Sequence, residues 1–439
     1  RAGSWRDATK GRTSRKWRIE PSLRRIAMRI AYITQSYPPM ISGASIVVEQ
    51  LAKGMAEREH QVLVIAASDK NHPYISTQKN LTVQRLRSMH HPLRVGQRFL
   101  VYPRASILKA LEKFRPDIIH SHEPILCWVG FEYAQRAHIP TTFTVHMLPW
   151  YVTAVLTDRG GLDKAVEKAG WKYLDILARK STSIITTTKT VSDIVTGAMS
   201  IDSETIPCGI DTRLFRPPLS DGETAVARRR LNLPLDIPLI LHVGRLDPEK
   251  MVERVIHAAA EVMNASPAHL VIVGDGKEKE KLVSLANSLG IQNRVHFTGY
   301  ISMDDGLPAV YRMANVFVMA SEVESQGLVL LEAAASGLPL AAFEATSIPE
   351  VVHHNRNGYL VKPGDVHAMA DAISQIVDSP ALAKQMGEES RRLAEHYDHE
   401  RAQLLHEQYY RKLIKQQSLE KREKPSSWKR VKVWMGLGE

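Results

Sequence analysis

Two glutamates with seven residues between them, Glu324 and Glu332, form the strongest chemical pattern in the chain. They lie in segment 321–332, which follows an expected strand, turns at Gly327 and enters an expected helix. Glycine permits a close backbone approach, and the free N–H groups of a helix start attract a phosphate. Glu332, about one turn inside the helix, can accept two sugar hydroxyls, and Glu324 can meet the sugar from the loop. The segment predicts a sugar-phosphate site that also includes Ser325, Gln326 and Leu328.

A glycine and two cations, Gly244, Arg245 and Lys250, follow the strand expected at 239–243. The two cations would meet in one loop beside a diphosphate. Fixed positive charges stabilise the charge that grows on a leaving nucleoside diphosphate, and they do so without a metal ion. We therefore expect both cations to take part in catalysis with Glu324, with no cofactor required. Surface cations that merely flank a helix are the alternative.

Two further glycine-containing loops could approach the same ligand. The first is centred on Gly274, after the strand expected at 270–273, and could contact the base or the phosphates. It is not a dinucleotide-binding fingerprint, because no G-x-G-x-x-G spacing is present. The second spans 37–43 and ends at Gly43, and its backbone N–H groups could close over a diphosphate from the opposite side. An ordinary turn is the alternative for both loops.

Three histidines lie at expected strand ends. His146 follows the strand at 141–145, and His120 and His122 lie at the end of the strand at 117–120. Ligands of parallel sheets bind at the carboxyl ends of the strands, so each histidine is a candidate. We favour His146 as the residue that faces the ligand. A structural histidine with satisfied hydrogen bonds is the alternative for each position.

These motifs lie in an alternation of strands and helices that is typical of parallel α/β sheets. The alternation runs twice, and a stretch rich in proline, 212–238, separates the two halves as a linker. We therefore expect two doubly wound domains that face each other across a ligand-binding cleft. In the first half we expect strands at 29–34, 61–67, 117–120, 141–145, 183–187 and 204–207, and helices at 44–58, 105–113 and 125–137. In the second half we expect strands at 239–243, 270–273, 294–298 and 316–319, and helices at 252–263, 277–289, 307–313 and 328–336.

Positive charge is concentrated at the two ends of the 439-residue chain. Residues 1–27 carry a net charge of +7 and residues 411–439 carry +6, which leaves −2 for the body of the chain. A nearly neutral body is unlike a nucleic-acid-binding domain and suits a globular enzyme with cationic ends. The expected organisation is a basic extension (1–27), a first α/β domain (28–212), a second α/β domain (213–398), a helix that crosses back toward the first domain (399–417) and a basic tail (418–439).

The low cysteine count and the lack of long apolar runs indicate the cellular compartment. Two cysteines, Cys127 and Cys208, are too few for a disulfide framework or a cysteine zinc site, which favours a reducing cytosol. The chain contains no run of about 18 apolar residues, so no transmembrane helix is expected. The first residues lack the apolar stretch of a signal peptide. Met28 opens the first strand and could be the true start, which would make residues 1–27 an upstream extension.

The tail combines aromatic and basic residues. Trp428 and Trp434 alternate with cations between 421 and 437. Tryptophans interleaved with cations favour the interface of an anionic membrane. We therefore expect the protein to be cytoplasmic and to bind the inner face of the plasma membrane peripherally through this tail. A disordered, solubilising tail is the alternative.

As a set, the motifs resemble glycosyltransferase family 4, the retaining sugar transferases with the GT-B fold of two Rossmann-like domains. The resemblance covers about residues 28–415. Beyond the motifs above, it includes the segments 206–211 (I-P-C-G-I-D), 348–352 (I-P-E-V-V) and 358–363 (G-Y-L-V-K-P).

The resemblance implies a role for each candidate residue. Arg245 and Lys250 would hold the donor diphosphate, and Glu324 with the backbone after it would hold the sugar hydroxyls. Glu332 would hold the ribose, and His146 would contact the sugar near the reacting carbon. The first domain would bind the acceptor and the second the nucleotide-sugar. The family is thought to react on the front face of the sugar, with the departing phosphate helping to deprotonate the acceptor and without a metal.

The resemblance also bears on the substrate. The run that begins at Glu324, E-S-Q-G-L-V, looks like the E-T-Q-G-L-V run common in diacylglycerol glycosyltransferases of this family. It implies transfer of glucose or galactose from a UDP donor to a membrane lipid such as diacylglycerol. The chain departs from the family pattern at Met251, which replaces a glycine, at Cys208, which replaces an asparagine, and at Thr346 and Ser347, which replace paired glycines.

Three alternatives remain open. The first keeps the transferase class and changes the acceptor to a phosphatidylinositol, a polyprenyl-linked oligosaccharide or a soluble sugar. The second is a nucleotide-sugar 2-epimerase, which would need acid and base carboxylates around the sugar ring, and the run of Glu324 and Glu332 argues against it. The third is a non-catalytic sensor of nucleotide-sugars.

Overall fold

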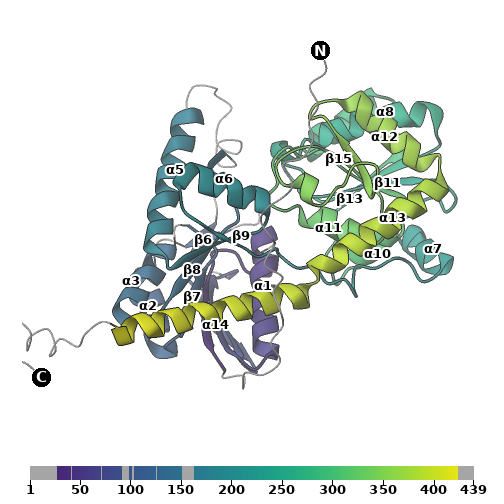
Figure 1. The fold of residues 1–439 in the computed structure, drawn as a ribbon. Coiled ribbons are helices and arrows are strands. Elements are labelled where there is room, and N and C mark those ends of the chain that lie inside the picture. Colours follow the sequence, from purple (N-terminus) through teal and green to yellow (C-terminus); the bar gives the residue numbers. More distant parts are fainter. Residues whose placement is uncertain are drawn as a thin grey trace, which may run out of the picture.

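The computed structural model describes residues 27–40, 42–70, 72–90, 98–100, 103–124, 126–150 and 163–423. They form two α/β domains, each on its own sheet, and a long helix that runs from the second domain across the first (Figure 1). This architecture confirms the expected pair of doubly wound domains. Residues 1–26 of the basic extension and the tail tryptophans Trp428 and Trp434 lie outside the described residues, so membrane binding by the tail stays a prediction.

The first domain contains an eight-stranded sheet in the order β10-β9-β8-β7-β1-β2-β4-β3. Its strands pair in parallel, except that β3 is antiparallel to β4 at one edge. The inner strands are apolar and buried along nearly their whole length, as expected for a parallel sheet covered on both faces. The strands are β1 (Arg29–Ile33), β2 (Gln61–Ala67), β3 (Tyr74–Gln78), β4 (Leu81–Leu86), β7 (Ile118–Ser121), β8 (Thr141–Val145), β9 (Ser183–Thr186) and β10 (Glu204–Thr205), with a separate pair, β5 (Ser88–His90) and β6 (Arg98–Leu100).

The helices of the first domain present apolar residues at helical spacing to this sheet. In α1 (Gly43–Glu57), Val48 and Leu51 are among the buried residues. The first turn of α1 is closed by a capping box, in which Ser42 Oγ accepts from the Ser45 N–H at 3.1 Å and Ser45 Oγ accepts from the Ser42 N–H at 2.8 Å. This cap fixes the end of the loop that leads into α1. The other helices are α2 (Arg104–Phe114), α3 (Cys127–Ala137), α5 (Asp163–Lys180) and α6 (Lys189–Met199).

The second domain contains a six-stranded, fully parallel sheet in the order β13-β12-β11-β14-β15-β16. The loops that carry Gly244, Gly274 and Glu324 leave the carboxyl ends of β11, β12 and β14, so the sheet order brings them together. The strands are β11 (Leu239–Val243), β12 (His269–Val273), β13 (Val295–Gly299), β14 (Val316–Met319), β15 (Leu340–Phe343) and β16 (Gly358–Val361). The helices are α7 (Asp221–Arg230), α8 (Val252–Ala265), α9 (Lys279–Ser288), α10 (Leu307–Arg312), α11 (Leu328–Ala335), α12 (Val366–Val377) and α13 (Pro380–Ala394).

The chain passes between the domains twice, and the two crossings lie side by side. The N–H of Ile210 donates to the carbonyl of Tyr397 at 2.9 Å, and the N–H of His399 donates to the carbonyl of Ile210 at 2.9 Å. From there α14 (His399–Glu423) runs across the first domain and packs against α1 (Figure 1). The C-terminal helix therefore completes the first domain rather than the second.

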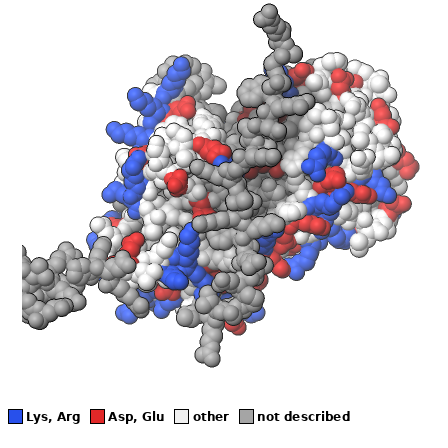
Figure 2. Space-filling view, in the orientation of Figure 1, with Lys and Arg blue, Asp and Glu red and all other residues white. Residues whose placement is uncertain are grey.

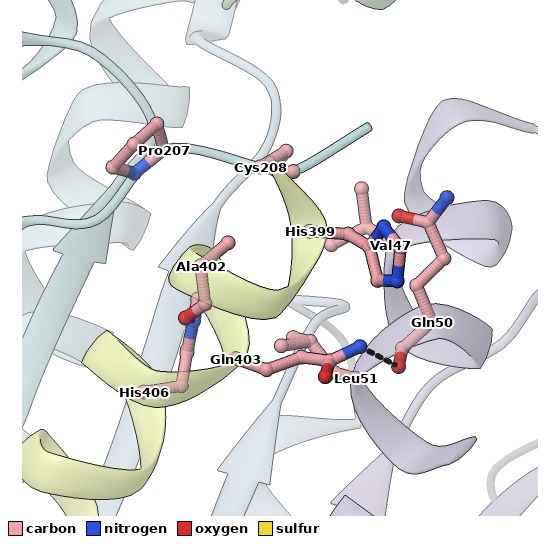
Figure 3. Close-up of a pocket in the computed structure, with 10 residues that line it drawn as sticks. Val47, Gln50, Leu51, Pro207, Cys208, His399, Ala402, Gln403 and His406 are labelled. Carbon is pink, nitrogen blue, oxygen red and sulfur yellow. Dashed lines mark hydrogen bonds between the residues drawn. The ribbon is translucent and has the colours of Figure 1, made fainter. Parts of the chain in front are cut away.

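A small cavity marks the place where the crossings, α1 and α14 meet (Figure 3). It measures about 10 Å³, room for roughly one water molecule. Gln403 of α14 donates from Nε2 to the carbonyl of Gln50 in α1 at 3.2 Å. A Cβ at Gly209 would lie 2.3 Å from the Cα of His399, so only glycine lets the crossings approach this closely. The joint between the domains is thus tightly packed.

Two expectations are corrected by the structure. The sequence predicts a linker over 212–238, whereas α7 lies within it. Few apolar residues are present in α7, which hides it from a periodicity argument, but acidic residues in its first turn and arginines in its last turn complement the helix dipole. The tail expected from residue 418 begins later, because α14 stays helical to Glu423. Within the described ranges, no helix combines the length and the apolarity needed to cross a membrane.

Candidate active site

The loop between β14 and α11, residues 321–327 and hereafter the donor loop, brings together the predicted cation and carboxylate. Lys250 Nζ donates to Glu324 Oε1 at 2.6 Å, although the residues are 74 positions apart in the sequence. Their side chains are only 20% and 13% exposed, so the pair is shielded from water. Charge-assisted hydrogen bonds fix both partners. Lys250, which is expected to bind the diphosphate, and Glu324, which is expected to bind the sugar, therefore lie side by side in the second domain.

Arg245, the other predicted cation, contacts acidic residues of its own loop. Its guanidinium pairs with Asp247 and, at 2.6 Å, with Glu249 Oε1. The side chain is 48% exposed, and exposed ion pairs contribute only about 0–1 kcal/mol, so the guanidinium can leave them at little cost. The structure places Arg245 one residue from Gly244 without joining it to the pair of Lys250 and Glu324. Its contact with a diphosphate stays a prediction.

Glycine-containing loops of both domains converge on the start of α11. Gly327 precedes α11 with φ +75°, and no side chain caps this helix start. A Cβ at Gly43 of the first domain would lie 3.9 Å from Leu328 Cδ1, so the loop before α1 reaches the same place. In the second domain, a Cβ at Gly274 would lie 1.8 Å from the carbonyl oxygen of Gly244, and only glycine permits that contact. The loop before α1 thus approaches an uncapped helix start, which favours an anion, and the Gly244 and Gly274 loops lie against each other in the second domain.

Glu332 lies inside α11 and is buried. One carboxylate oxygen, Oε2, accepts from the Tyr311 hydroxyl at 2.7 Å. Burial raises the pKa of the Glu332 carboxyl to about 7, and the Tyr311 hydrogen bond opposes that rise. The other oxygen, Oε1, can accept hydroxyl groups of a ligand. Near neutral pH this carboxyl is therefore divided between its charged and neutral forms.

The three candidate histidines occupy different environments. His120 is fully buried, and its ring nitrogens lie 2.6 Å from Thr144 Oγ1 and 2.6 Å from the Tyr410 hydroxyl, so it ties α14 to the sheet. His122 Nδ1 lies 2.8 Å from His146 Nε2. His146 is only half-buried, and burial lowers its pKa to about 4, so its ring is neutral at pH 7. The structure gives His120 a structural part and leaves His146, supported by His122, as the least buried member of the group.

Gln326 of the donor loop contacts the other domain. Its amide oxygen accepts from the N–H of Cys208 at 2.8 Å, and its amide nitrogen donates to the carbonyl of Cys208 at 2.8 Å. Both halves of the side chain are thus taken up by the backbone of the first crossing. Contact between the Gln326 side chain and a donor, expected from the sequence, is not what this arrangement offers. Only the backbone of Gln326 remains for that role.

Glu350 of the I-P-E-V-V segment provides a second contact between the domains. Its carboxylate accepts from the backbone N–H of Lys189 at 3.1 Å and of Thr190 at 2.6 Å, both in the first turn of α6. A carboxylate at a helix N-terminus satisfies free N–H groups and the helix dipole.

The described residues contain no cluster of three or more His, Cys, Asp or Glu side chains placed to hold a metal ion.

Comparison with known families decides the class of the protein. Residues 41–214 match the family described as Glycosyltransferase Family 4, and residues 224–393 match Glycosyl transferases group 1. Together the two matches cover both domains. The chain belongs to the family 4 glycosyltransferases. It is an enzyme that transfers a sugar from a nucleotide-sugar donor.

Two curated relatives and two solved structures illustrate this similarity. An uncharacterized glycosyltransferase of Methanocaldococcus jannaschii is 28% identical over 355 residues, which cover 80% of this chain and 89% of the relative. A D-inositol 3-phosphate glycosyltransferase of Acidothermus cellulolyticus is 33% identical over 301 residues, which cover 64% of each chain.

The solved structures share the GT-B fold. Sucrose-phosphate synthase from Thermosynechococcus elongatus has a TM-score of 0.75 and 25% identity, with 88% of this chain and 98% of that chain covered. Anabaena HepE in complex with UDP and glucose has a TM-score of 0.68 and 19% identity, with 86% and 98% covered. The predicted GT-B architecture of the glycosyltransferase is therefore confirmed.

The pKa of Glu332 predicts a pH-dependent donor affinity for the glycosyltransferase. If the carboxylate holds the ribose hydroxyls, protonation below pH 7 removes an acceptor. With a pKa of about 7, roughly a tenth of the carboxyl is ionised at pH 6 and nine-tenths at pH 8. We expect UDP-glucose to bind about tenfold more weakly at pH 6 than at pH 8, as measured by calorimetry. Glu332→Gln should bind weakly at both pH values, and an equally steep profile in that variant would contradict the assignment.

Several residues that shape the site of the glycosyltransferase escape the sequence analysis. Tyr311 holds the inner carboxylate, and Glu350 caps α6 from the other domain. His242, at the end of β11, is buried beside Gly244, and burial lowers its pKa to about 4. Its Nδ1 lies 3.0 Å from the carbonyl of Val318, which makes Nδ1 the donor. A polar residue in an otherwise apolar strand was the available signal for His242.

Proposed function

We propose that the protein is a retaining hexosyltransferase that moves glucose or galactose from a UDP donor to a membrane lipid such as diacylglycerol. In the proposed step, the bond between C1 of the sugar and the diphosphate breaks, and an acceptor hydroxyl forms the new bond on the same face. The acceptor proton passes to an oxygen of the departing UDP. The positive charge of Lys250 and Arg245, rather than a metal, stabilises that leaving group.

One observation carries the donor half of the proposal: the shielded pair of Lys250 and Glu324 beside the uncapped start of α11. A diphosphate at the helix start would compete for the lysine, and the released carboxylate could accept hydroxyls of the sugar. UDP is proposed because HepE, which shares the fold, has been solved with UDP and glucose. The buried carboxylate of Glu332 is suited to the ribose of the same donor.

The membrane half of the proposal is supported by the distribution of charge. Residues 28–212 carry 21 Arg or Lys against 16 Asp or Glu, a net charge of +5. Residues 213–398 carry 18 against 24, a net charge of −6. The two domains of one enzyme thus differ in sign. An anionic bilayer attracts the first and repels the second, so charge alone orients the molecule with its first domain toward the lipid.

Helix α5 presents part of this charge on an exposed side. Lys164, Lys168 and Lys172 recur every four residues on one exposed side of the helix, and none has an ion-pair partner among the described residues. Ile176 continues the same line and is 37% exposed. Figure 2 shows the resulting blue edge over α5, on the side of the first domain that faces away from the second. Unpaired lysines around an exposed apolar residue suit an anionic lipid surface.

The lysines of α5 give a direct test of this orientation. Each cation near an anionic surface contributes about 1 kcal/mol, so replacing Lys164, Lys168 and Lys172 with glutamine is expected to weaken binding to phosphatidylglycerol vesicles roughly 100-fold. Sedimentation at low salt measures the change. The matched control replaces Lys277, Lys279 and Lys281 of the acidic second domain. Equal losses in the two triple variants would show that overall charge rather than the α5 face directs binding.

A second acceptor class has an observation in its favour. The resemblance to lipid-specific transferases lies in the run that begins at Glu324 and includes Gln326, and the contact of Gln326 with Cys208 accounts for that residue without any acceptor. The Acidothermus relative, by its name, glycosylates inositol 3-phosphate, which favours transfer to a soluble phosphorylated polyol. The lipid acceptor therefore rests on the charge distribution.

An acceptor screen separates the two candidates. The enzyme is incubated with UDP-glucose or UDP-galactose and with either diacylglycerol vesicles or inositol 3-phosphate, and the product is analysed by NMR. The proposal expects an α-linked glycolipid, which preserves the configuration of the donor. A product found only with the soluble acceptor would overturn the lipid acceptor, and a β-linked product would overturn retention.

A further inference from the structure

The carbonyl groups of the donor loop are held by side-chain hydroxyls. Ser347 Oγ donates to the carbonyl of Glu324 at 2.6 Å, and Thr346 Oγ1 donates to the carbonyl of Glu322 at 3.0 Å. Both hydroxyls come from the loop after β15, at the positions where the family pattern has paired glycines. Glycine could make neither contact. Here the segment that carries the predicted sugar-binding carboxylate is therefore anchored by side chains on both sides of Val323.

The first domain supplies two more hydroxyls to the same loop. Thr187 Oγ1 and Thr188 Oγ1 donate to the carbonyl of Ser325 at 3.0 and 3.1 Å. Thr188 is also the N-cap of α6, where its hydroxyl accepts from the Val191 N–H at 3.2 Å. The carboxylate of Glu350 holds the next residues of that helix. The two threonines are thus fixed against the second domain and cannot drift away from Ser325 while these contacts persist.

Backbone strain at Thr346 indicates that its contact matters. Thr346 has φ +45°, in the left-handed region that β-branched residues avoid and glycine adopts freely. Strained residues persist where the surroundings over-determine them, and they cluster at functional sites. Glycine would relieve the strain but would lose the hydrogen bond to Glu322. The chain keeps the strained residue and the hydroxyl together.

We infer that Thr187, Thr188, Thr346 and Ser347, hereafter the hydroxyl clamp, are positioning residues that set the donor loop for recognition of the sugar part of the donor. The four hydroxyls hold the carbonyl groups of three residues of the loop, Glu322, Glu324 and Ser325, from both domains. Glu324 then presents its carboxylate from a fixed backbone and accepts a hydrogen bond from Lys250 at 2.6 Å. This inference rests on the proposed UDP-hexose donor. Because the hydroxyl clamp fixes the backbone, it restricts the positions at which the Glu324 carboxylate can accept a sugar hydroxyl. The clamp therefore contributes to specificity for the hexose.

The proposal separates the sugar from the nucleotide. UDP alone would contact the start of α11, Glu332 and the cations, none of which the clamp holds directly. A donor sugar would also need Glu324 and the carbonyl-bearing backbone of the loop. Loss of the clamp is therefore expected to weaken UDP-glucose binding while UDP binding stays nearly constant.

The test is a double variant, Thr346→Val with Ser347→Ala, which removes both hydroxyls and keeps the shapes close to the original. We expect the Kd for UDP-glucose to rise about tenfold and the Kd for UDP to change less than twofold, as measured by calorimetry. Thr346→Ser retains a hydroxyl and should bind like the wild type. The matched control is Ser390→Ala, which removes a buried hydroxyl that donates to the carbonyl of Asn357 at 3.2 Å, away from the donor loop.

Hydrogen exchange provides a measurement that does not depend on the donor. Amides of residues 322–328 should exchange at least tenfold faster in the double variant than in the wild type, with no such change in Ser390→Ala. Equal exchange rates in the double variant and the wild type would overturn the clamp. Failure of the wild type to bind any UDP-sugar would instead refute the proposed donor, and the exchange result would still decide whether the hydroxyls order the loop.

Discussion

Replacing Lys250 with alanine is expected to lower kcat by roughly 30- to 1,000-fold, which corresponds to about 2–4 kcal/mol of transition-state stabilisation. Two losses combine in this variant. The cation that would meet the leaving diphosphate disappears, and Glu324 loses the ammonium group at 2.6 Å that holds its carboxylate. The second loss should also raise the KM for the donor. Steady-state kinetics with UDP-glucose and the acceptor identified by the screen measure both parameters.

A lysine pair elsewhere in the same domain provides the control. Lys279 Nζ lies 3.4 Å from Asp275 Oδ2 on the surface after β12. Exposed pairs contribute little, so Lys279→Ala should leave kcat within a factor of two. A loss of less than tenfold in Lys250→Ala, or an equal loss in both variants, would contradict a catalytic part for Lys250. Arg245→Ala, which removes the more exposed cation, is expected to follow Lys250→Ala in direction.

Acid is expected to unfold the first domain well before its carboxylates are protonated. Burial lowers the pKa of His146 and His406 to about 4 and holds the pKa of His120 and His122 well below the usual value. In the unfolded chain the same histidines titrate near 6.5, so between pH 6.5 and 4 the unfolded state binds more protons. Stability is therefore complete above pH 6.5 and is lost as the pH falls.

The expected loss is large because four histidines act together. His146 and His406, whose pKa is about 4, each contribute up to about 1.4 kcal/mol per pH unit between pH 6.5 and 4, and His120 and His122 act in the same direction. Urea denaturation at pH 8, 7, 6 and 5 measures the trend. Fluorescence is a suitable probe, because Trp128, Trp150 and Trp171 all pack in the core of the first domain.

Two histidine variants check the cause. His406→Gln removes one of the titrating groups and should reduce the pH slope. His367 is exposed on α12, where Glu261 and Asp371 raise its pKa, so its contribution has the opposite sign and its removal cannot flatten the slope. A stability that stays constant between pH 7 and 5 would show that these rings are not held neutral in the fold.

The sequence predicts most of the strands that are buried on both faces, because their apolar runs are visible in the sequence. It misses β3, which is exposed along most of its length and lacks such a run. It also misses β4, which alternates buried and half-buried residues, and β15 and β16, which read L-A-A-F and G-Y-L-V and so include alanine and glycine, residues depleted in strands. Charge-rich α7 is missed because its apolar face is small.

In the candidate site, sequence motifs indicate Lys250 and Glu324 separately, whereas only the fold shows that the two side chains are in contact. The contacts that assemble the donor loop left no local pattern at all. Thr187 reaches Ser325 across 138 positions, Cys208 reaches Gln326 across 118, and Thr190 reaches Glu350 across 160. Local spacing cannot reveal pairs so distant in the sequence, so the contact of the Gln326 amide with Cys208 between the domains is visible only in the fold.

The paired crossings at Ile210 and His399 have a mechanical consequence. The two segments are hydrogen-bonded to each other, so sliding of one segment along the other, or free rotation of one domain, would break these bonds. The pair therefore restricts the relative motion of the domains more than a single connecting segment would. A rotation of one domain about the line of these two segments would keep their mutual bonds, although it would have to break the contacts of Thr187 and Thr188 with Ser325 and of Glu350 with α6. The donor loop contacts these segments through Gln326 and Cys208. A donor that shifts the donor loop would therefore move the segments that connect the domains directly, because the loop contacts them at Cys208.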